Sequence, residues 1–181
     1  MTTPTESEIK LRVEDPGAAR AELAAIGATL ARGRHLEDNA LFDDRRRSLR
    51  SAGCVLRLRR NAVGAQLTVK GPRRDVERVK TRPEVEVGVT DAALTERLLE
   101  LLGYERVFRY QKYREVWHWR DVEIVLDETP VGAFLEIEGS IETIHAAARA
   151  LGRGPDDYVR ESYVQLFFEA GGEGDMVFDR P

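Results

Sequence analysis

The chain has 181 residues, 42% hydrophobic and 33% charged, which is enough to bury the core of one globular domain. Its formal net charge of −4 argues against nucleic acid as a partner, because binding along a phosphate backbone needs a net basic surface. The single cysteine, Cys54, excludes an internal disulfide, and the sequence shows neither a signal peptide nor an apolar run of about 20 residues, so we expect a cytoplasmic protein with no membrane partner.

The first predicted strand, residues 6–13, alternates charged with mostly apolar residues, so its charges share one face. Asp15 before Pro16 is typical of a helix N-cap followed by the first helical residue. The next predicted elements are, in order, a helix from Pro16 to Gly27, an extended segment from His35 to Asp43, an arginine-rich loop toward Gly53, and a hairpin of strands from Cys54 to Arg60 and from Ala65 to Lys70.

The second half of the chain is predicted to begin with a mobile loop over residues 73–79. It continues with strands over residues 80–89, 107–119, 122–127 and 134–139, and with helices over residues 91–103, 140–152 and 155–170. In the first of these helices Leu94, Leu98, Leu101 and Leu102 form one stripe, which predicts that the helix covers an apolar surface. We expect residues 1–170 to form a single domain and residues 171–181 to form a flexible tail.

About eight strands, most of them joined by short turns, and four helices predict an α+β fold in which one antiparallel sheet closes or nearly closes into a β-barrel with covering helices. Charged residues recur at every second position in most of these strands. If apolar residues such as Ile9, Leu58 and Ile137 face the helices, the charged set must line the lumen. A lumen of this kind is a water-filled channel that holds a charged ligand.

Strand parity assigns seven acidic and seven basic side chains to this lumen. The acids are Glu6, Glu8, Glu84, Glu86, Asp127, Glu136 and Glu138, and the bases are Lys10, Arg12, Arg57, Arg59, Lys70, Lys112 and Arg114. Clustered bases suit a polyanion, because Lys and Arg donate charge-assisted hydrogen bonds to phosphate oxygens. The acids would repel that anion unless they hold a divalent cation, and Mg²⁺ and Mn²⁺ prefer oxygen ligands. Acids for metal and bases for phosphate therefore form one predicted site.

The first strand carries Glu6-x-Glu8-x-Lys10, which resembles the ExExK signature of the CYTH domain, the triphosphate tunnel metalloenzymes. That family includes class IV adenylate cyclases, thiamine triphosphatases and inorganic tripolyphosphatases. The resemblance continues in the family's order over nearly the whole chain, through residues 41–43, 56–59, 67–71, 80–86, 112–114, 126–128, 132–138 and 162–163. Ser7, where the family usually has an apolar residue, departs from the pattern.

The resemblance implies an eight-stranded antiparallel tunnel that binds a triphosphate-containing small molecule through basic residues and a divalent metal, Mg²⁺ or Mn²⁺, through acidic ones. The substrate-binding set is then Lys10, Arg12, Arg57, Arg59, Lys70, Lys80, Arg82, Lys112 and Arg114. The metal-binding set is Glu6, Glu8, Glu84, Glu86, Asp127, Glu136 and Glu138.

The preferred hypothesis is a metal-dependent phosphohydrolase with inorganic triphosphate as its substrate. Catalysis would rest on positioning and charge stabilisation by Lys10, Arg57, Arg59, Lys70, Lys112 and Arg114, with Lys10 orienting the attacking water. The alternative enzyme is a class IV adenylate cyclase, in which the ribose 3′-hydroxyl of ATP replaces water as the nucleophile. A non-catalytic sensor of polyphosphate or nucleotide is the alternative from another class. The sequence is compatible with each of these substrates and with a monomer or a homodimer.

Overall fold

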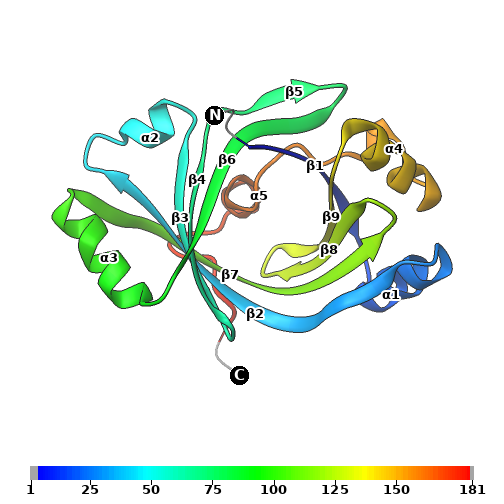
Figure 1. The fold of residues 1–181 in the computed structure, drawn as a ribbon, viewed down its shortest axis with the longest axis horizontal. Coiled ribbons are helices and arrows are strands. Elements are labelled where there is room, and N and C mark those ends of the chain that lie inside the picture. The colour runs from blue at the N-terminus through cyan, green and yellow to red at the C-terminus, as the bar shows by residue number, and fades with distance from the viewer. Residues whose placement is uncertain (1–3, 180–181) are drawn as a thin grey trace.

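The computed structural model describes residues 4–179, and the centre of this part of the chain is a closed antiparallel β-barrel of eight strands (Figure 1). Around the barrel the strands are, in order, β1 (Thr5–Val13), β9 (Gly132–Glu138), β8 (Val122–Thr129), β7 (Tyr104–Trp119), β2 (Thr29–Asp44), β3 (Val55–Asn61), β4 (Gly64–Lys70) and β6 (Val79–Val89). Antiparallel pairing of β1 with β6 closes the ring. The predicted α+β fold with a closed barrel is therefore confirmed.

The register of the strands brings the charged residues of neighbouring strands together. Glu8 of β1 lies opposite Lys80 of β6 and opposite Glu138 of β9. Lys10 lies opposite Glu136 in the same pair of strands. Directly opposed residues of antiparallel strands point to the same face of a sheet, so the charges that alternate along each strand also line up across strands inside the barrel.

Two helices, α1 (Pro16–Ala25) and α4 (Ile141–Ala150), pack on the outer face of β1, β8 and β9. Each begins at a predicted N-cap: Asp15 accepts a hydrogen bond from the Ala18 amide at 2.6 Å, and Ser140 caps α4 in the same way. The outward-facing apolar residues of the strands form the main core beneath them, among them Ile9, Leu11, Ile124, Leu135 and Ile137. Within residues 4–179 no helix is long and apolar enough to cross a membrane.

Helix α3 (Ala92–Leu101) packs on β3 and β7, but not through the predicted leucine stripe. Leu99 is its buried residue and joins Phe42 and Leu58 in a second apolar cluster. The stripe residues Leu94, Leu98, Leu101 and Leu102 are 54–74% exposed. The expectation that this stripe covers an apolar surface is therefore wrong for this structure. Helical periodicity identifies an apolar face of a helix. The way in which the helix sits on the barrel determines which of its faces is buried.

Pairing with other strands reshapes two segments that the sequence analysis described as shorter or irregular. Strand β2 begins at Thr29 rather than at His35, because it pairs with β7 along almost its whole length through several register shifts. Part of the predicted mobile loop forms a short strand, β5 (Arg74–Val76), which pairs with the outer edge of β6. The arginine-rich loop contains the short helix α2 (Ser48–Ser51), because the Asp43 carboxylate accepts hydrogen bonds from backbone amides there.

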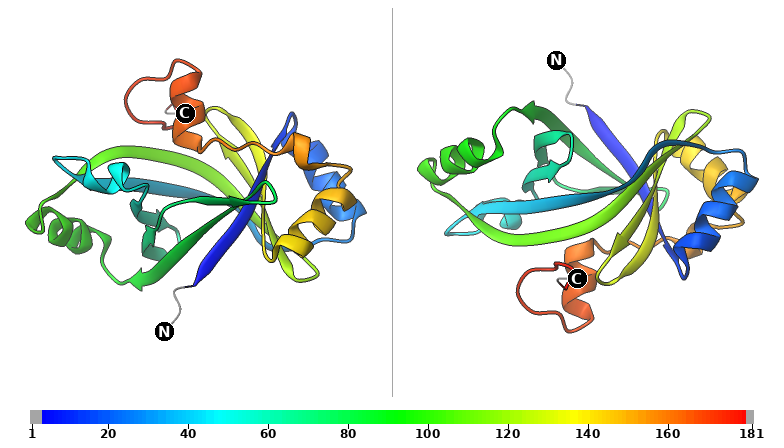
Figure 2. Two further views of the ribbon diagram at one scale, coloured as in Figure 1. Left: turned by 90° about the horizontal axis from the view of Figure 1, so that it is seen from above. Right: turned by 90° about the horizontal axis from the view of Figure 1, so that it is seen from below.

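The single helix predicted over residues 155–170 divides into the 3₁₀ turn η1 (Pro155–Asp157) and helix α5 (Tyr163–Glu169). Between them the Val159 amide donates to the Lys10 carbonyl at 2.8 Å, so the chain runs extended beside β1 and cannot continue as a helix. Ser162 then caps α5. Helix α5 lies over one end of the barrel (Figures 1 and 2).

The chain after α5 returns to the barrel instead of leaving it (Figure 2). Met176 is fully buried, and its amide donates to the Arg109 carbonyl at 2.9 Å. Its carbonyl accepts from the Gln111 amide at 2.9 Å, which pairs this segment with β7. These contacts hold the segment around Met176 against β7, whereas the sequence predicts a flexible tail over residues 171–181. Residues 180–181 lie outside the described residues.

Candidate functional site

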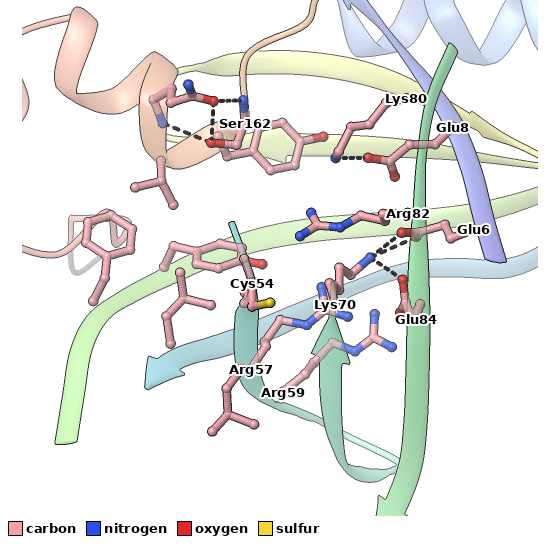
Figure 3. Close-up of a pocket in the computed structure, with 18 of the residues that line it drawn as sticks. Glu6, Glu8, Cys54, Arg57, Arg59, Lys70, Lys80, Arg82, Glu84 and Ser162 are labelled. Carbon is pink, nitrogen blue, oxygen red and sulfur yellow. Dashed lines mark hydrogen bonds and ion pairs between the residues drawn. The ribbon is translucent and has the colours of Figure 1, made fainter. Parts of the chain in front are cut away.

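The lumen of the barrel contains a cavity of about 860 Å³ (Figure 3). Most of the predicted site residues line it: Glu6, Glu8, Lys10, Arg57, Arg59, Lys70, Lys80, Arg82, Glu84, Glu86, Lys112, Arg114, Glu136 and Glu138. Asp43, Arg50 and Glu123, which the sequence analysis did not assign to the site, also contribute, as does Arg47 of the arginine-rich loop. Of the residues that the structure describes, ten basic and eight acidic side chains therefore line one cavity.

Acidic side chains from β1, β6 and β9 crowd together in one part of this cavity. The Lys70 ammonium lies 2.7 Å from Glu6 Oε2 and 2.6 Å from Glu84 Oε2, and Lys80 pairs with Glu8 (Figure 3). Burial and the neighbouring Glu84 and Glu8 raise the pKa of Glu6 to about 8. Burial and Glu8 also raise the pKa of Glu138 to about 7. The lysines thus leave part of the negative charge of this cluster uncompensated.

These carboxylates have the chemistry of a site for a hard divalent cation, because all the donor atoms are oxygens. As the side chains stand, no group of three or more carboxylates, histidines and cysteines within residues 4–179 surrounds a point suited to a metal ion. The ammonium groups of Lys70 and Lys80 are instead the cations that pair with these oxygens. The donor set fits Mg²⁺ or Mn²⁺. In this structure the negative charge of the carboxylates is neutralised by ammonium groups and by retained protons, and a divalent cation could neutralise it instead.

The basic side chains of β3 form another part of the cavity wall. Arg59 lies 3.1 Å from Glu86 and 3.2 Å from Glu37. Arg57 donates to Thr68 Oγ1 at 3.3 Å, while its buried Nε atom has no hydrogen-bond partner among the described residues. Burial opposes the charge of Arg57, but nearby oxygens, including those of Tyr110 and Glu37, raise its pKa and keep it cationic. Arg57 therefore keeps one buried donor that no oxygen of the described residues accepts.

Asp127 does not line the cavity; it lies behind the basic wall. Its fully buried carboxylate accepts hydrogen bonds from Arg114 at 2.7 Å, Lys112 at 2.9 Å and the Tyr163 hydroxyl at 2.9 Å. Burial opposes ionisation, yet Arg114 and Lys112 hold the pKa of Asp127 well below its usual range. In this structure Asp127 fixes two bases, and its assignment as a metal ligand stays a prediction.

Lys10 connects the cavity to the segment that covers it. Its ammonium donates to the Glu161 carbonyl at 2.9 Å, lies 4.0 Å from the Tyr163 ring centroid, and is 3.6 Å from Glu136. Burial lowers the pKa of Lys10, and the neighbouring Lys80 and Lys112 act in the same direction. Lys10 is thus held from the side of α5 as well as from the barrel.

Arg12 is a predicted substrate-binding residue that the structure places outside the cavity. Its side chain is exposed, and its guanidinium lies 4.8 Å from the ring centroid of Phe134, the residue opposite it on β9. The rings of Phe134 and Tyr163, with centroids 5.2 Å apart, fill the barrel at this level. Strand parity gives the correct face for Arg12, but the open part of the lumen ends before it, so the structure places Arg12 at the surface. Its assignment as a substrate-binding residue stays a prediction.

The sequence analysis missed Glu37 of β2. Its side chain is 3% exposed and lies 3.2 Å from Arg59, 3.7 Å from Lys112 and 4.0 Å from Arg114. Burial alone would raise its pKa, but Lys112, Arg114 and Arg59 lower the pKa of Glu37 to about 2. The alternation of His35, Glu37 and Asn39 along β2 is the signal that parity reasoning could have used.

Part of the cavity wall is apolar, which the sequence analysis also did not predict. This part is formed by Leu41, Val55, Val107, Phe108, Val164 and Phe168. The rings of Phe108 on β7 and Phe168 on α5 have centroids 5.6 Å apart. Since the charged and the apolar parts belong to one cavity, a ligand that fills the whole of it carries both a polar and an apolar portion.

A closed antiparallel barrel whose lumen is lined by opposed acidic and basic side chains is a charged tunnel, and this fold and lining define the class of protein. The CYTH domain model matches residues 4–163, so the chain belongs to the CYTH domain family. The family predicted from Glu6-x-Glu8-x-Lys10 and the segments that follow it is therefore confirmed.

The chain is similar to other proteins over most of its length. A protein of Methanocaldococcus jannaschii named as a candidate adenylate cyclase is 30% identical over 172 residues, which cover 89% of this chain and 97% of that protein. The crystal structure of a candidate adenylate cyclase from Vibrio parahaemolyticus is 22% identical, with a TM-score of 0.82, and the match covers 92% of this chain and 99% of that one. A Hippeastrum protein described as a candidate adenylyl cyclase with a dominant triphosphatase activity is 20% identical, with a TM-score of 0.68 and 93% and 97% coverage. The two structures show a shared fold.

Proposed function

We propose that this protein is a metal-dependent phosphohydrolase that binds a triphosphate inside the barrel, with inorganic triphosphate as the preferred substrate. The observation that carries the proposal is the division of one cavity into a basic wall and a crowded carboxylate cluster. Such a pair of surfaces suits an anion that arrives together with a divalent cation. The Hippeastrum protein, described as having a dominant triphosphatase activity, has the same fold.

The basic residues carry the substrate in this proposal. Arg57, Arg59, Lys112 and Arg114 line the cavity, and ion pairs with carboxylates of neighbouring strands hold them in place. Phosphoryl transfer requires the protein mainly to align the reacting groups and to stabilise charge on the transferring oxygens. Guanidinium and ammonium groups that ion pairs already hold in place do this without reorganisation. Lys10, Lys70, Lys80 and Arg82 complete the proposed substrate-binding set.

The acidic residues hold the metal in this proposal. Glu6, Glu8, Glu84 and Glu138 form the crowded cluster, and Glu86, Glu136 and Asp127 complete the proposed metal-binding set. When bound, Mg²⁺ or Mn²⁺ neutralises phosphate oxygens and polarises the bond that breaks. Lys10 orients the attacking water: its ammonium is directed by the Glu161 carbonyl, and the Tyr163 ring beside it keeps bulk water away.

A second candidate function is adenylate cyclisation of ATP, and the apolar part of the cavity favours it. An inorganic triphosphate has no group to place beside Phe108, Phe168 and Val107, whereas a nucleotide has a base. The relative from Methanocaldococcus jannaschii carries the name of a candidate adenylate cyclase. Both reactions use the same charged tunnel and differ in the nucleophile, which is water in one and the ribose 3′-hydroxyl in the other.

Product analysis separates these functions. The protein is incubated with Mg²⁺ or Mn²⁺ and, in parallel, with inorganic triphosphate, ATP or thiamine triphosphate, and the products are resolved by ion-exchange chromatography. Release of phosphate from inorganic triphosphate supports the proposed hydrolase. Formation of cyclic AMP and pyrophosphate from ATP supports the cyclase. Tight triphosphate binding without turnover of any substrate replaces both with a non-catalytic sensor.

A further inference from the structure

Glu37 is a buried ionised group to which the proposed function gives no role. It lies on β2, does not line the cavity, and stands behind the basic wall. The acidic side chains of the proposed metal cluster are on other strands, whereas the charged groups nearest to Glu37 are Arg59, Lys112 and Arg114, with the His35 ring at 3.8 Å. Glu37 therefore faces the same cations that would receive the phosphate oxygens, from the opposite side.

Each of these bases is already held by another acceptor. Arg59 donates to Gln66 at 3.0 Å and to Glu86 at 3.1 Å. Arg114 is held by Asp127 and Glu136, and Lys112 by Asp127. The geometry of the basic wall thus does not depend on Glu37 alone. What Glu37 adds is one fixed negative charge at the centre of the cationic cluster.

We propose that Glu37 is a built-in counter-ion that neutralises part of the basic wall in the empty tunnel and so limits its affinity for a triphosphate. This inference rests on the proposed function. An incoming anion gains the attraction of the bases but meets the repulsion of a carboxylate that is locked in the wall and cannot leave. Limited affinity favours turnover, because a tunnel that holds its anionic product too tightly releases it slowly. Glu37 acts through the bases that it touches and contacts no substrate.

Asn39 provides an independent position for testing this charge effect. It is the next residue of the same face of β2, and it lies opposite Arg59 on β3 and Tyr110 on β7. Its side chain is fully buried, and neither its amide oxygen nor its amide nitrogen has a hydrogen-bond partner among the described residues. Asp has nearly the same shape as Asn, so Asn39→Asp adds a second negative charge to the basic wall with little change in packing. Glu37→Gln has the opposite effect, because it removes a negative charge from the wall.

The experiment measures binding of inorganic triphosphate by titration calorimetry, with Mg²⁺ and at constant ionic strength, to the wild type, Glu37→Gln and Asn39→Asp. The matched control is Glu115→Gln, which removes a buried carboxylate that pairs with Arg20 at 2.7 Å outside the lumen. At an effective dielectric constant of 20, one charge changes the affinity of an anion tenfold from about 12 Å away and by more from a shorter distance. We expect at least tenfold tighter binding to Glu37→Gln, at least tenfold weaker binding to Asn39→Asp, and no change for Glu115→Gln.

Unchanged or weaker binding of triphosphate by folded Glu37→Gln overturns the inference. An equal gain in affinity in Glu115→Gln also overturns it, because the gain would then come only from the change in net charge of the protein. If Glu37→Gln does not fold, Asn39→Asp decides: unaltered affinity in that variant overturns the inference. A wild type that does not bind triphosphate refutes the proposed function instead. The role of Glu37 is then measured with sulfate, which should raise the melting temperature of Glu37→Gln more than that of the wild type, and equal shifts overturn it.

Discussion

Inorganic triphosphate should stabilise this protein strongly with Mg²⁺ and weakly with a chelator, whereas phosphate should do little in either case. Ten basic and eight acidic side chains among the described residues line the cavity. The carboxylates of Glu37 and Asp127 lie directly behind the wall, so the fixed charges balance when every one of these carboxylates is ionised. Each bound divalent cation then leaves an excess of about +2, which attracts a triphosphate far more than a phosphate.

The expected magnitude follows from binding linkage. A ligand at 100 times its dissociation constant stabilises the native state by about 2.7 kcal/mol, and one present at its dissociation constant by only about 0.4 kcal/mol. For a chain of this size about 1 kcal/mol corresponds to roughly 2–4 °C in melting temperature. We therefore expect shifts of roughly 5–10 °C for triphosphate with Mg²⁺ and roughly 1 °C for phosphate, with pyrophosphate between them.

Thermal melts with each anion, in Mg²⁺ and in chelator, measure these shifts at constant ionic strength. Sodium chloride at matched ionic strength is the control for general screening. Equal protection by all three anions would show that the cavity is a generic basic patch. Protection by triphosphate that does not depend on the metal would remove the acidic cluster from the substrate site.

Three further predictions concern single residues. Glu8→Gln should abolish metal-dependent turnover and weaken Mg²⁺ binding in calorimetry while the protein still melts cooperatively, and Glu14→Gln, an exposed neighbour on the same segment, should behave as the wild type. Arg59→Lys should weaken triphosphate binding by about tenfold, because lysine lacks the two parallel donors of the guanidinium group. Arg60→Lys, at an outward-facing residue, is the control. Equal affinity of the two variants for triphosphate would contradict a two-donor contact at Arg59. Glu37 has its pKa lowered to about 2, so its ion pairs stabilise the fold above its unfolded pKa of 4.5 and are lost as the pH falls toward 2. Glu37→Gln should therefore lose roughly 3 kcal/mol near pH 7, and the difference in melting temperature from the wild type should close between about pH 4.5 and 2; a difference that persists at pH 2 would indicate a packing defect.

The faces of the strands could be predicted from the sequence because side-chain direction in a strand is a local property with a period of two. Glu6, Glu8 and Lys10 alternate with Ser7 and with the apolar residues Ile9 and Leu11, and the structure places all three charged residues in the cavity. Helix starts such as those after Asp15 and Ser140 are also local, since the capping side chain bonds to an amide only three residues away.

Position along the barrel axis could not be predicted in the same way. Arg12 has the lumen parity of Lys10, but the rings of Phe134 and Tyr163 close the barrel between them. Whether the lumen is open at a given level depends on the tilt of all the strands and on where α5 crosses the end of the barrel. The sequence of a single segment determines neither of these. The same holds for α3, whose leucine stripe the sequence shows but whose buried face only the barrel determines.

The sequence by itself therefore determined which residue types face the lumen and, through Glu6-x-Glu8-x-Lys10 and the segments that follow it, the family. Only the tertiary structure decided how those charges are paired: Lys70 with Glu6 and Glu84, Asp127 behind the wall, and Glu37 among the bases. The physical reason is that alternation is fixed by neighbouring residues, whereas electrostatic energy depends on distances between strands that are far apart in the chain. Those distances are fixed only when β1 pairs with β6 and closes the barrel.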